Sequence, residues 1–210
     1  MSDEPKVARI AHYPSLIAVV PRLGSWVAMA VAAALAGCAL LAPSPPPPPA
    51  PAFELIGRVA VSHDGRSFTS GVRWQHTAQR DELWLLTPTG QALAYIVGNA
   101  AGATFTGSDR SQHQAADIGS LTHRALGWEM PITHLAWWVQ GEATPGAVVQ
   151  AVERDPQGRL AALEQDGWRV AYVYDSEGAR EGRLRRLELS GASQVLRLVI
   201  DGWRRGGDTQ

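Results

Sequence analysis

Residues 53–75 read FELIGRVAVSHDGRSFTSGVRWQ, and this stretch decides the fold. Apolar or small side chains recur at every second position on both sides of His63-Asp64-Gly65, a triplet typical of a hairpin turn. Because successive side chains of a strand point to opposite faces of a sheet, the stretch predicts two antiparallel strands with one apolar face. That face is formed by Leu55, Gly57, Val59 and Val61 on the first strand and by Phe68, Ser70, Val72 and Trp74 on the second.

The same period continues after this hairpin. Residues 82–86 and 91–97 form two further apolar runs, joined by Thr87-Pro88-Thr89-Gly90, and residues 103–106 predict a short fifth strand. In the run at 91–97 both alternating sets are apolar. We therefore expect this part of the sheet to be covered on one face and to touch something else on the other.

The middle of the chain changes to a helical period. Between residues 114 and 125, Ile118, Leu121 and Ala125 recur at spacings of three and four, which predicts a short amphipathic helix that Gly127 ends. A second helix begins near Pro131. Its apolar face is formed by Ile132, Leu135, Trp138 and Val139.

The last third returns to strands. Runs at 148–153, 159–164, 168–174, 184–189 and 194–203 are separated by turn sequences and predict an antiparallel meander. The fold class is therefore mainly β, with about ten strands and two short helices inserted after the fifth strand. A sheet of this size must twist or close, and closure would remove its exposed edges.

Cys38 is the only cysteine in 210 residues. It follows the apolar run at residues 26–36, which would span only about 16 Å as a helix, against roughly 30 Å for a membrane core. That length is typical of a signal peptide. Ala36 and Gly37 before Cys38 resemble the bacterial lipoprotein signal, in which the chain is cut before a cysteine that carries acyl chains; the alternative is a secretory signal with an incidental cysteine. Because the segment before the run is long and acidic, we expect the true start to lie downstream of Met1.

Four regions follow from this pattern: a signal peptide at 1–37, a lipidated cysteine and tether at 38–52, a folded domain at 53–204 and a tail at 205–210. The tether contains Pro43-Ser44-Pro45 and a further run of prolines, which predicts an extended polyproline II spacer. Ala39 stands where an aspartate would resemble an inner-membrane retention signal. We therefore expect the outer membrane to be the destination.

Charge and composition exclude several classes of function. A chain that starts at Cys38 keeps 16 of 19 basic residues, all of them arginine, and 18 of 20 acidic ones, a net charge of −2. This is not the pattern of a nucleic-acid-binding protein. With no second cysteine, the chain has neither an internal disulfide nor a site of several thiolates for a metal. The sequence predicts no metal and no cofactor.

An enzyme has little support in the sequence. Histidines are available at positions 63, 76, 113, 123 and 134, but none lies in a Gly-x-Ser-x-Gly or His-Glu-x-x-His motif, and there is no Walker loop. We therefore assign no catalytic residue and keep a lipid-acting hydrolase as a remote alternative. A structural lipoprotein that tethers an envelope assembly would explain Cys38 and the prolines, but it would leave the two-sided apolar strands unexplained.

Several short motifs, in this order, resemble the LolB family. They are Cys38 in its lipoprotein signal, Thr87-Pro88-x-Gly90, Gly127-x-x-Met130-Pro131-Ile132, Leu135 with Trp138, Val139 and Gly141, Pro145-Gly146, Asp166-Gly167-Trp168 with Tyr172, and Leu198-x-Ile200-Asp201-x-Trp203. The resemblance spans residues 53–203. It implies an open antiparallel β half-barrel of ten to eleven strands, with short helices as a lid over an apolar cavity.

The resemblance also implies a function. LolB proteins are lipid-anchored at the periplasmic face of the outer membrane, accept acylated lipoproteins from the periplasmic carrier LolA and insert them into that membrane without nucleotide. For this chain we expect a monomer whose partners are a LolA-type carrier, acylated cargo and the membrane. The candidate acyl-cavity residues are Val59, Val61, Phe68, Val72, Trp74, Leu83, Leu85, Leu93, Tyr95, Ile118, Leu121, Leu135 and Trp138, with ordinary core packing as the alternative for each.

The chain departs from the family at two places. The hairpin Pro88-Thr89-Gly90, which the resemblance implies in membrane transfer, has Thr89 where the family has an exposed leucine. A neighbour such as Leu86 or Leu93 would then have to serve. The family also has a helix between its cysteine and the first strand, where this chain has prolines.

The lipoprotein reading predicts that Cys38 carries the acyl chains. Cells expressing the chain and fed an alkyne fatty acid should label the wild-type protein, and Cys38→Ser should remove the label because no other thiol is present. A label that persists on Cys38→Ser would show that this cysteine is not the lipidation site.

Overall fold

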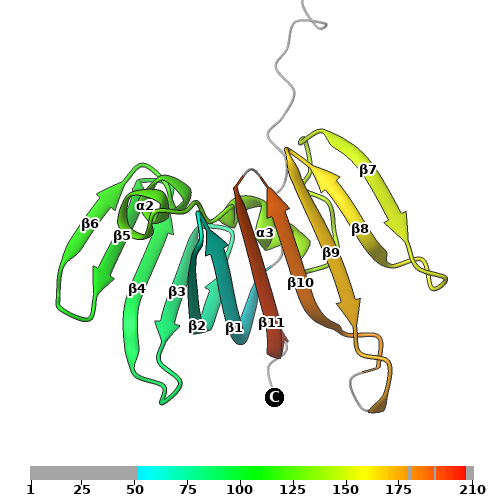
Figure 1. The fold of residues 1–210 in the computed structure, drawn as a ribbon, viewed down its shortest axis with the longest axis horizontal. Coiled ribbons are helices and arrows are strands. Elements are labelled where there is room, and N and C mark those ends of the chain that lie inside the picture. The colour runs from blue at the N-terminus through cyan, green and yellow to red at the C-terminus, as the bar shows by residue number, and fades with distance from the viewer. Residues whose placement is uncertain (1–51, 179–180, 192, 207–210) are drawn as a thin grey trace, which may run out of the picture. The chain divides into compact units, whose positions relative to one another are not determined.

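The computed structural model describes residues 52–178, 181–191 and 193–206. These residues form one open antiparallel sheet of 11 strands and two short helices (Figure 1). The strands are β1 (Phe53–His63), β2 (Arg66–His76), β3 (Arg80–Leu86), β4 (Ala92–Asn99), β5 (Gly102–Gly107), β6 (Gln112–Ala115), β7 (Val149–Arg154), β8 (Leu160–Gln165), β9 (Trp168–Tyr174), β10 (Leu184–Gly191) and β11 (Gln194–Arg205). The helices are α2 (Ile118–Leu126) and α3 (Ile132–Trp138). The predicted signal peptide, Cys38 and the tether up to residue 51 lie outside the described residues.

The order of the strands places the helices over one face of the sheet. Strands that follow each other in the chain pair, except β6 and β7, and β1 also pairs with β11, so the first and last strands lie side by side at the centre. The two edges are β6 and β7, which are consecutive in the chain. The segment that joins them must therefore cross from one edge to the other, and it carries α2 and α3 across the inner face.

Side-chain alternation confirms the predicted hairpin. On β1, Leu55, Val59 and Val61 are buried on the inner face, while Ile56 and Arg58 are exposed on the outer face. The β1 register with β11 shifts between Ile56 and Gly57. A Cβ atom at Gly57 would lie 2.1 Å from the carbonyl oxygen of Val199, so only glycine fits at this bulge, where the strand bends.

The sequence prediction was wrong at the start of the first helix. Residues 114 and 115, expected in the helix, are the last residues of β6, and α2 begins only after Asp117, whose carboxylate accepts a hydrogen bond from the Ser120 backbone N–H at 2.8 Å. The strand carries no apolar alternation, because its side chains at the sheet edge are mostly exposed. Its pairing with β5 comes from the backbone, which a pattern of apolar side chains does not report.

The other edge strand, β7, buries no side chain. All six of its residues are exposed, including Val149 and Val152, and the preceding Val148 is 67% exposed. Strand β7 pairs with β8 in a register that shifts twice, and its exposed Glu153 lies 3.5 Å from Arg169 of β9. Among the described residues, no helix is long and apolar enough to cross a membrane.

Helix α3 is fastened to the sheet by the buried side chain of Gln165 at the end of β8. The amide oxygen of Gln165 accepts hydrogen bonds from the Trp138 indole N–H and the Thr144 backbone N–H, both at 2.9 Å. Its amide nitrogen donates to the Thr144 carbonyl at 2.9 Å and lies 3.3 Å from that of Ala147. The side chain of Gln165 therefore supplies hydrogen-bond partners both to the last residue of α3 and to the loop that follows it.

The segment from Met130 to Trp138, which covers the inner face of the sheet and is called the cover below, is attached at its other end through α2. The hydroxyl of Thr122, a fully buried residue, accepts a hydrogen bond from the Met130 backbone N–H at 2.9 Å. Gln194 of β11 donates to the Glu129 carbonyl at 2.8 Å. The segment from Met130 to Trp138 is thus held at both ends by buried side-chain hydrogen bonds, and its apolar residues fill the space between.

Removing the Gln165 amide should loosen α3. We expect Gln165→Ala to lower the free energy of unfolding by about 3 kcal/mol, because the Trp138 indole N–H and the Thr144 backbone N–H would remain buried without partners. Urea denaturation would measure this change. The matched control is Gln75→Ala on the outer face, where the only amide contact is a 3.5 Å hydrogen bond to Glu54, and the loss should stay under about 1 kcal/mol. Equal losses for the two variants would contradict the role given to Gln165.

Candidate functional site

The inner face of the sheet holds most of the residues predicted to line a cavity. Phe68 is only partly buried and packs at the margin of this core. The others that face inward or lie on the covering helices are buried: Val59, Val61, Val72, Trp74, Leu83, Leu85, Ile118, Leu121, Leu135 and Trp138.

The prediction that Leu93 and Tyr95 face inward was wrong. Tyr95 lies on the outer face, where its ring packs 5.0 Å from that of Trp84 and its hydroxyl donates to Glu82 at 2.6 Å. Leu93 is 36% exposed beside the β3–β4 turn. Both residue sets of β4 are apolar, so its sequence does not show which set faces inward. Pairing with β3 decides this, placing Ala94 and Ile96 opposite Leu85 and Leu83.

A small apolar cavity lies between the centre of the sheet and the segment that covers it. Its volume is about 20 Å³. The sheet side is formed by Leu55, Val59, Val72, Trp74, Leu83, Leu196 and Leu198, and the cover by Met130 and Leu135. Ligand pockets generally measure about 300–1,000 Å³. The interior is therefore closed, and the side chains of the cover fill the space that an acyl chain would need.

Some predicted residues belong to the core without lining this cavity. Ile118 of α2 packs on β4 at Gly98, where an added Cβ atom would lie 2.6 Å from the Ile118 side chain. Leu55, Leu196 and Leu198 line the cavity but were missing from the prediction, although each follows the period-two pattern of its strand. Met130 was also missed. It lies between the helices, where no periodicity marks a buried position.

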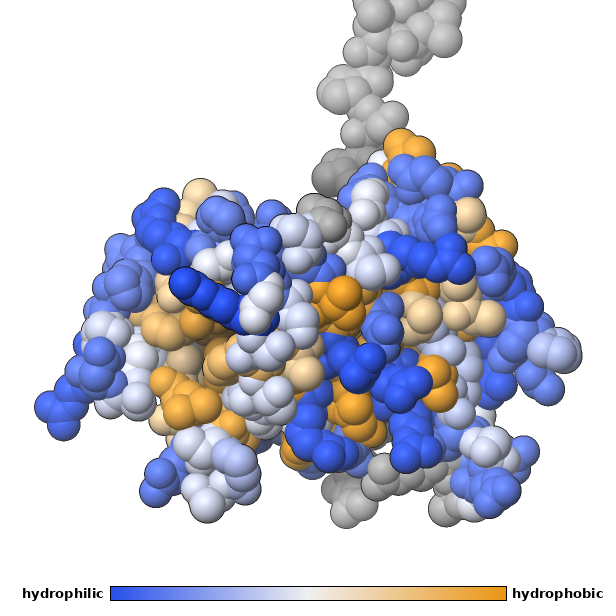
Figure 2. Space-filling model, viewed as in Figure 1, coloured by the Kyte–Doolittle hydropathy of each residue, from blue (hydrophilic) through white to orange (hydrophobic). Residues whose placement is uncertain are grey.

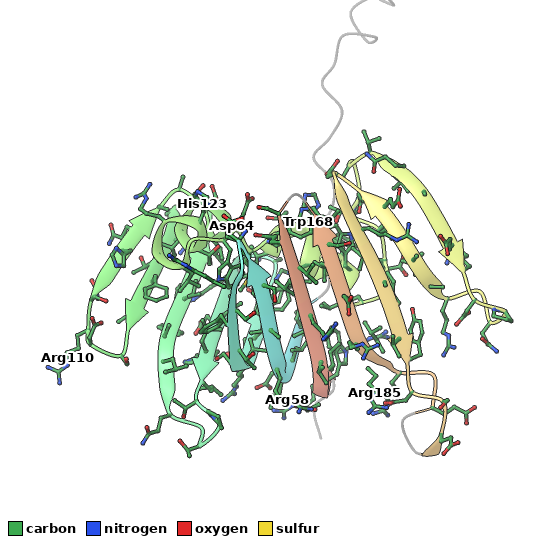
Figure 3. The ribbon with its side chains drawn as sticks, viewed as in Figure 1. Arg58, Asp64, Arg110, His123, Trp168 and Arg185 are labelled. Atoms are coloured by element: carbon green, nitrogen blue, oxygen red, sulfur yellow. The ribbon has the colours of Figure 1, made fainter. Side chains whose placement is uncertain are left out.

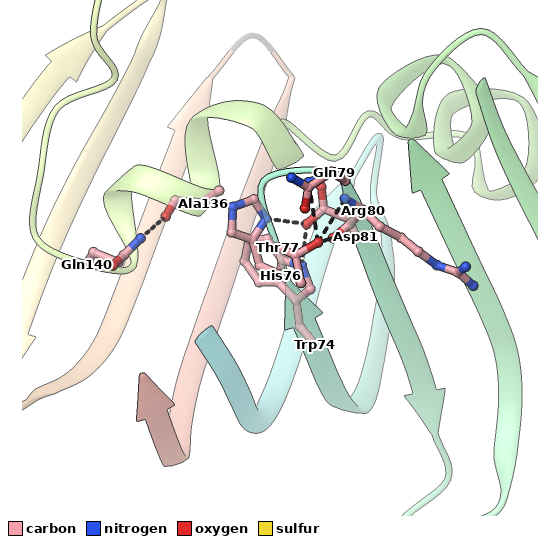
Figure 4. Close-up of polar contacts among 8 residues, drawn as sticks. All are labelled: Trp74, His76, Thr77, Gln79, Arg80, Asp81, Ala136 and Gln140. Atoms are coloured by element: carbon pink, nitrogen blue, oxygen red, sulfur yellow. Dashed lines mark hydrogen bonds and ion pairs between the residues drawn. The ribbon is translucent and has the colours of Figure 1, made fainter. Parts of the chain in front are cut away.

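Trp74, which lines the cavity, is held in place by a hydrogen bond to Asp81. Its indole N–H donates to Asp81 at 2.8 Å, and the same carboxylate oxygen lies 2.7 Å from Nδ1 of His76 (Figure 4). The rings of Phe53 and His76 stack with centroids 5.0 Å apart. These contacts fix the tryptophan at the end of β2, near α3. Among the described residues, no group of three or more His, Cys, Asp or Glu could hold a metal ion.

The predicted transfer hairpin is the turn between β3 and β4. The Gly90 N–H donates to the Thr87 carbonyl at 2.9 Å, and Gly90 adopts a positive φ of 84° that favours glycine. Pro88 and Thr89 are exposed at its tip. Hydrophobic side chains gather over β3 and β4 on the outer face, whereas hydrophilic ones mix with them over β10 and β11 (Figure 2).

Comparison with known proteins places the chain in a family. The family model described as "Outer membrane lipoprotein LolB" matches residues 51–203. The outer-membrane lipoprotein LolB of Nitrosomonas europaea is 36% identical over 160 residues, covering 75% of this chain and 74% of that protein. The LolB of Thiobacillus denitrificans is 37% identical over 175 residues, covering 81% and 92%.

Solved structures offer only a distant likeness. A LolA superfamily protein from Nitrosomonas europaea superposes with a TM-score of 0.42 at 9% identity, over 74% of this chain and 86% of that one. The match to the family model, by contrast, runs from the residues before β1 through both helices into the last strand, β11. The chain belongs to the LolB family of outer-membrane lipoproteins, the receptors of lipoprotein localisation.

Proposed function

We propose that this chain takes acylated lipoproteins from a LolA-type carrier, holds their acyl chains between the sheet and α3, and passes them to the outer membrane. The observation that carries the proposal is the apolar interior that two side chains, Met130 and Leu135, close from one side. A purely structural tether would need no such removable cover. A lipid-acting hydrolase would need a nucleophile and a base, whereas every side chain around this interior is apolar apart from the indole N–H of Trp74.

Acyl chains enter by displacing the cover. The sheet side of the interior belongs to strands paired on both edges, so it stays in place, while α3 has only seven residues and short connections. Lifting Met130 and Leu135 exposes Val59, Val72 and Leu83 to the incoming chain. The cargo then occupies the space that the cover vacates.

This exchange also explains release. Each methylene that leaves water contributes about 0.8 kcal/mol, but the cargo must replace the apolar contacts that the cover makes in the closed state. The net affinity is the difference between these two quantities. A receptor of this kind binds acyl chains reversibly and loses them to a bilayer without nucleotide, cofactor or catalytic residue.

The anchor and the folded domain act together. We infer that Cys38 is lipidated at the periplasmic face of the outer membrane and that the prolines at 43–49 space a monomeric domain from it. The domain begins at Phe53, which is buried and stacks on Trp203 with centroids 4.6 Å apart. The tether therefore joins the domain at a packed point beside the central strands.

Membrane transfer uses the β3–β4 hairpin in this proposal. Thr89 at the tip is polar, so the apolar contact falls to Leu93, which is 36% exposed at the base of the turn, and to Leu86 opposite Ala92. These residues lie on the outer face, away from the interior that holds the cargo. The hairpin can then touch the bilayer while the interior still holds the acyl chains.

Weakening the cover should increase acyl-chain binding. We expect Leu135→Ala to bind an environment-sensitive fatty-acyl probe several-fold more tightly while losing about 2–5 kcal/mol of stability, because it removes cover contacts that compete with the ligand. Fluorescence titration measures the first effect and urea denaturation the second. Leu187→Ala is the matched control, since Leu187 is fully buried on β10 and does not line the cavity. Tighter binding by both variants would point to general loosening instead of a cover.

Cargo transfer tests the proposal as a whole. The full chain carrying Cys38→Ser, mixed with a LolA-type carrier loaded with an acylated lipoprotein, should take up the cargo without ATP. The same lipoprotein without its acyl chains should not be taken up. Failure to acquire acylated cargo in a co-purification assay would remove the receptor proposal.

A further inference from the structure

A second and larger pocket opens near the end of α3, separate from the central cavity. Its volume is about 560 Å³, within the usual size of a ligand site, and it shares no lining residue with the central cavity. The walls come from the loop after α3, the β7–β8 turn, the β9–β10 connection and the end of β11. The β9–β10 connection and the β3–β4 hairpin lie at the same end of the strands (Figure 1).

One side of this pocket is apolar. Val139, Leu160, Leu184 and Ile200 contribute aliphatic side chains, and Trp203 an indole ring. Val139, Leu160 and Ile200 are buried by the surrounding protein, whereas Leu184 and Trp203 are partly exposed and available to a ligand. A hydrocarbon chain would find contacts there that water does not provide.

The rim of the same pocket is basic. Four arginines, Arg154, Arg159, Arg183 and Arg205, line it together with a single carboxylate, Glu142. Asp155 pairs with Arg159 at 2.7 Å. Arg183 and Arg205 are exposed and make no ion pair with any residue within the described ranges. They leave two guanidinium groups available to an anion, which arginine binds with good geometry.

We propose that this pocket binds an anionic phospholipid, with the acyl chain against Leu184 and Trp203 and the phosphate at Arg183 and Arg205. A zwitterionic lipid fits less well, because its ammonium group would face four arginines. The site is distinct from the interior proposed for cargo, and it gives the receptor a contact with the lipids of its target membrane.

Single-chain lipids test the headgroup directly. The full chain carrying Cys38→Ser is titrated below the micelle concentration with palmitoyl-lysophosphatidylglycerol, palmitoyl-lysophosphatidylcholine and glycerol phosphate, using Trp fluorescence and calorimetry. We expect the anionic lysolipid to bind about tenfold more tightly than the zwitterionic one. Equal affinity for the two lysolipids would overturn the proposal. Glycerol phosphate that binds as tightly as the anionic lysolipid would overturn it as well, because the site would then take a free anion.

Variants identify the pocket. The double variant Arg183→Gln/Arg205→Gln should lose about tenfold in affinity for the anionic lysolipid. The control Arg110→Gln changes an arginine at the opposite side of the sheet and should have no effect (Figure 3). If the double variant binds like wild type, or Arg110→Gln loses as much, the preference comes from overall charge and the proposal fails.

Cargo uptake from the LolA-type carrier is measured on the protein used for these titrations. A chain that takes up cargo but does not prefer the anionic lysolipid would refute this inference and leave the receptor role intact.

Discussion

The hydrogen bonds of Gln165 hold the interior of this protein closed. A sheet of 11 strands presents a wide apolar face, and α3 with its flanking loops is short for the area it covers. Hydrophobic contact alone does not fix the orientation of so short a helix. The Gln165 amide does so by binding the Trp138 indole and both backbone groups of Thr144. A buried polar side chain thus gives a mainly hydrophobic interface one defined geometry.

Much of the fold could be predicted from the sequence, because side chains of period two mark strands whose one face is buried. The hairpin at residues 53–75 and the final meander were recognisable in this way, and apolar spacings of three and four marked the two helices, although not the start of the first. The predictions that were wrong concern residues whose positions are set by pairing with other strands. The phase of β4 is set by its register with β3, so Leu93 and Tyr95 were placed on the wrong face. Strand β6 forms through its backbone, and its side chains carry no pattern.

The sequence predicted many of the residues that form the candidate site, but it did not predict that the interior is filled and closed. Apolar residues of the first three strands were correctly placed on the inner face, yet no sequence pattern distinguishes a filled interior from an empty one. That distinction depends on Met130 and Leu135, which reach the sheet from a segment distant in sequence. Gln165 was not recognised at all. A single glutamine at the end of a strand has no local signature, and its partners lie 21 and 27 residues away.

Strand β7 shows how the cover could move without unfolding the sheet. Its side chains bury nothing, so detaching it costs little beyond the hydrogen bonds to β8. The loop after α3 leads directly into this strand. Once the hydrogen bonds between Gln165 and this loop break, slack for a lifted helix can come from β7 while β8 to β11 remain paired. The sheet therefore consists of a rigid cooperative unit around β1 and β11 and an edge of low local stability at β7. Opening of the receptor would involve this edge and leave the central strands in place.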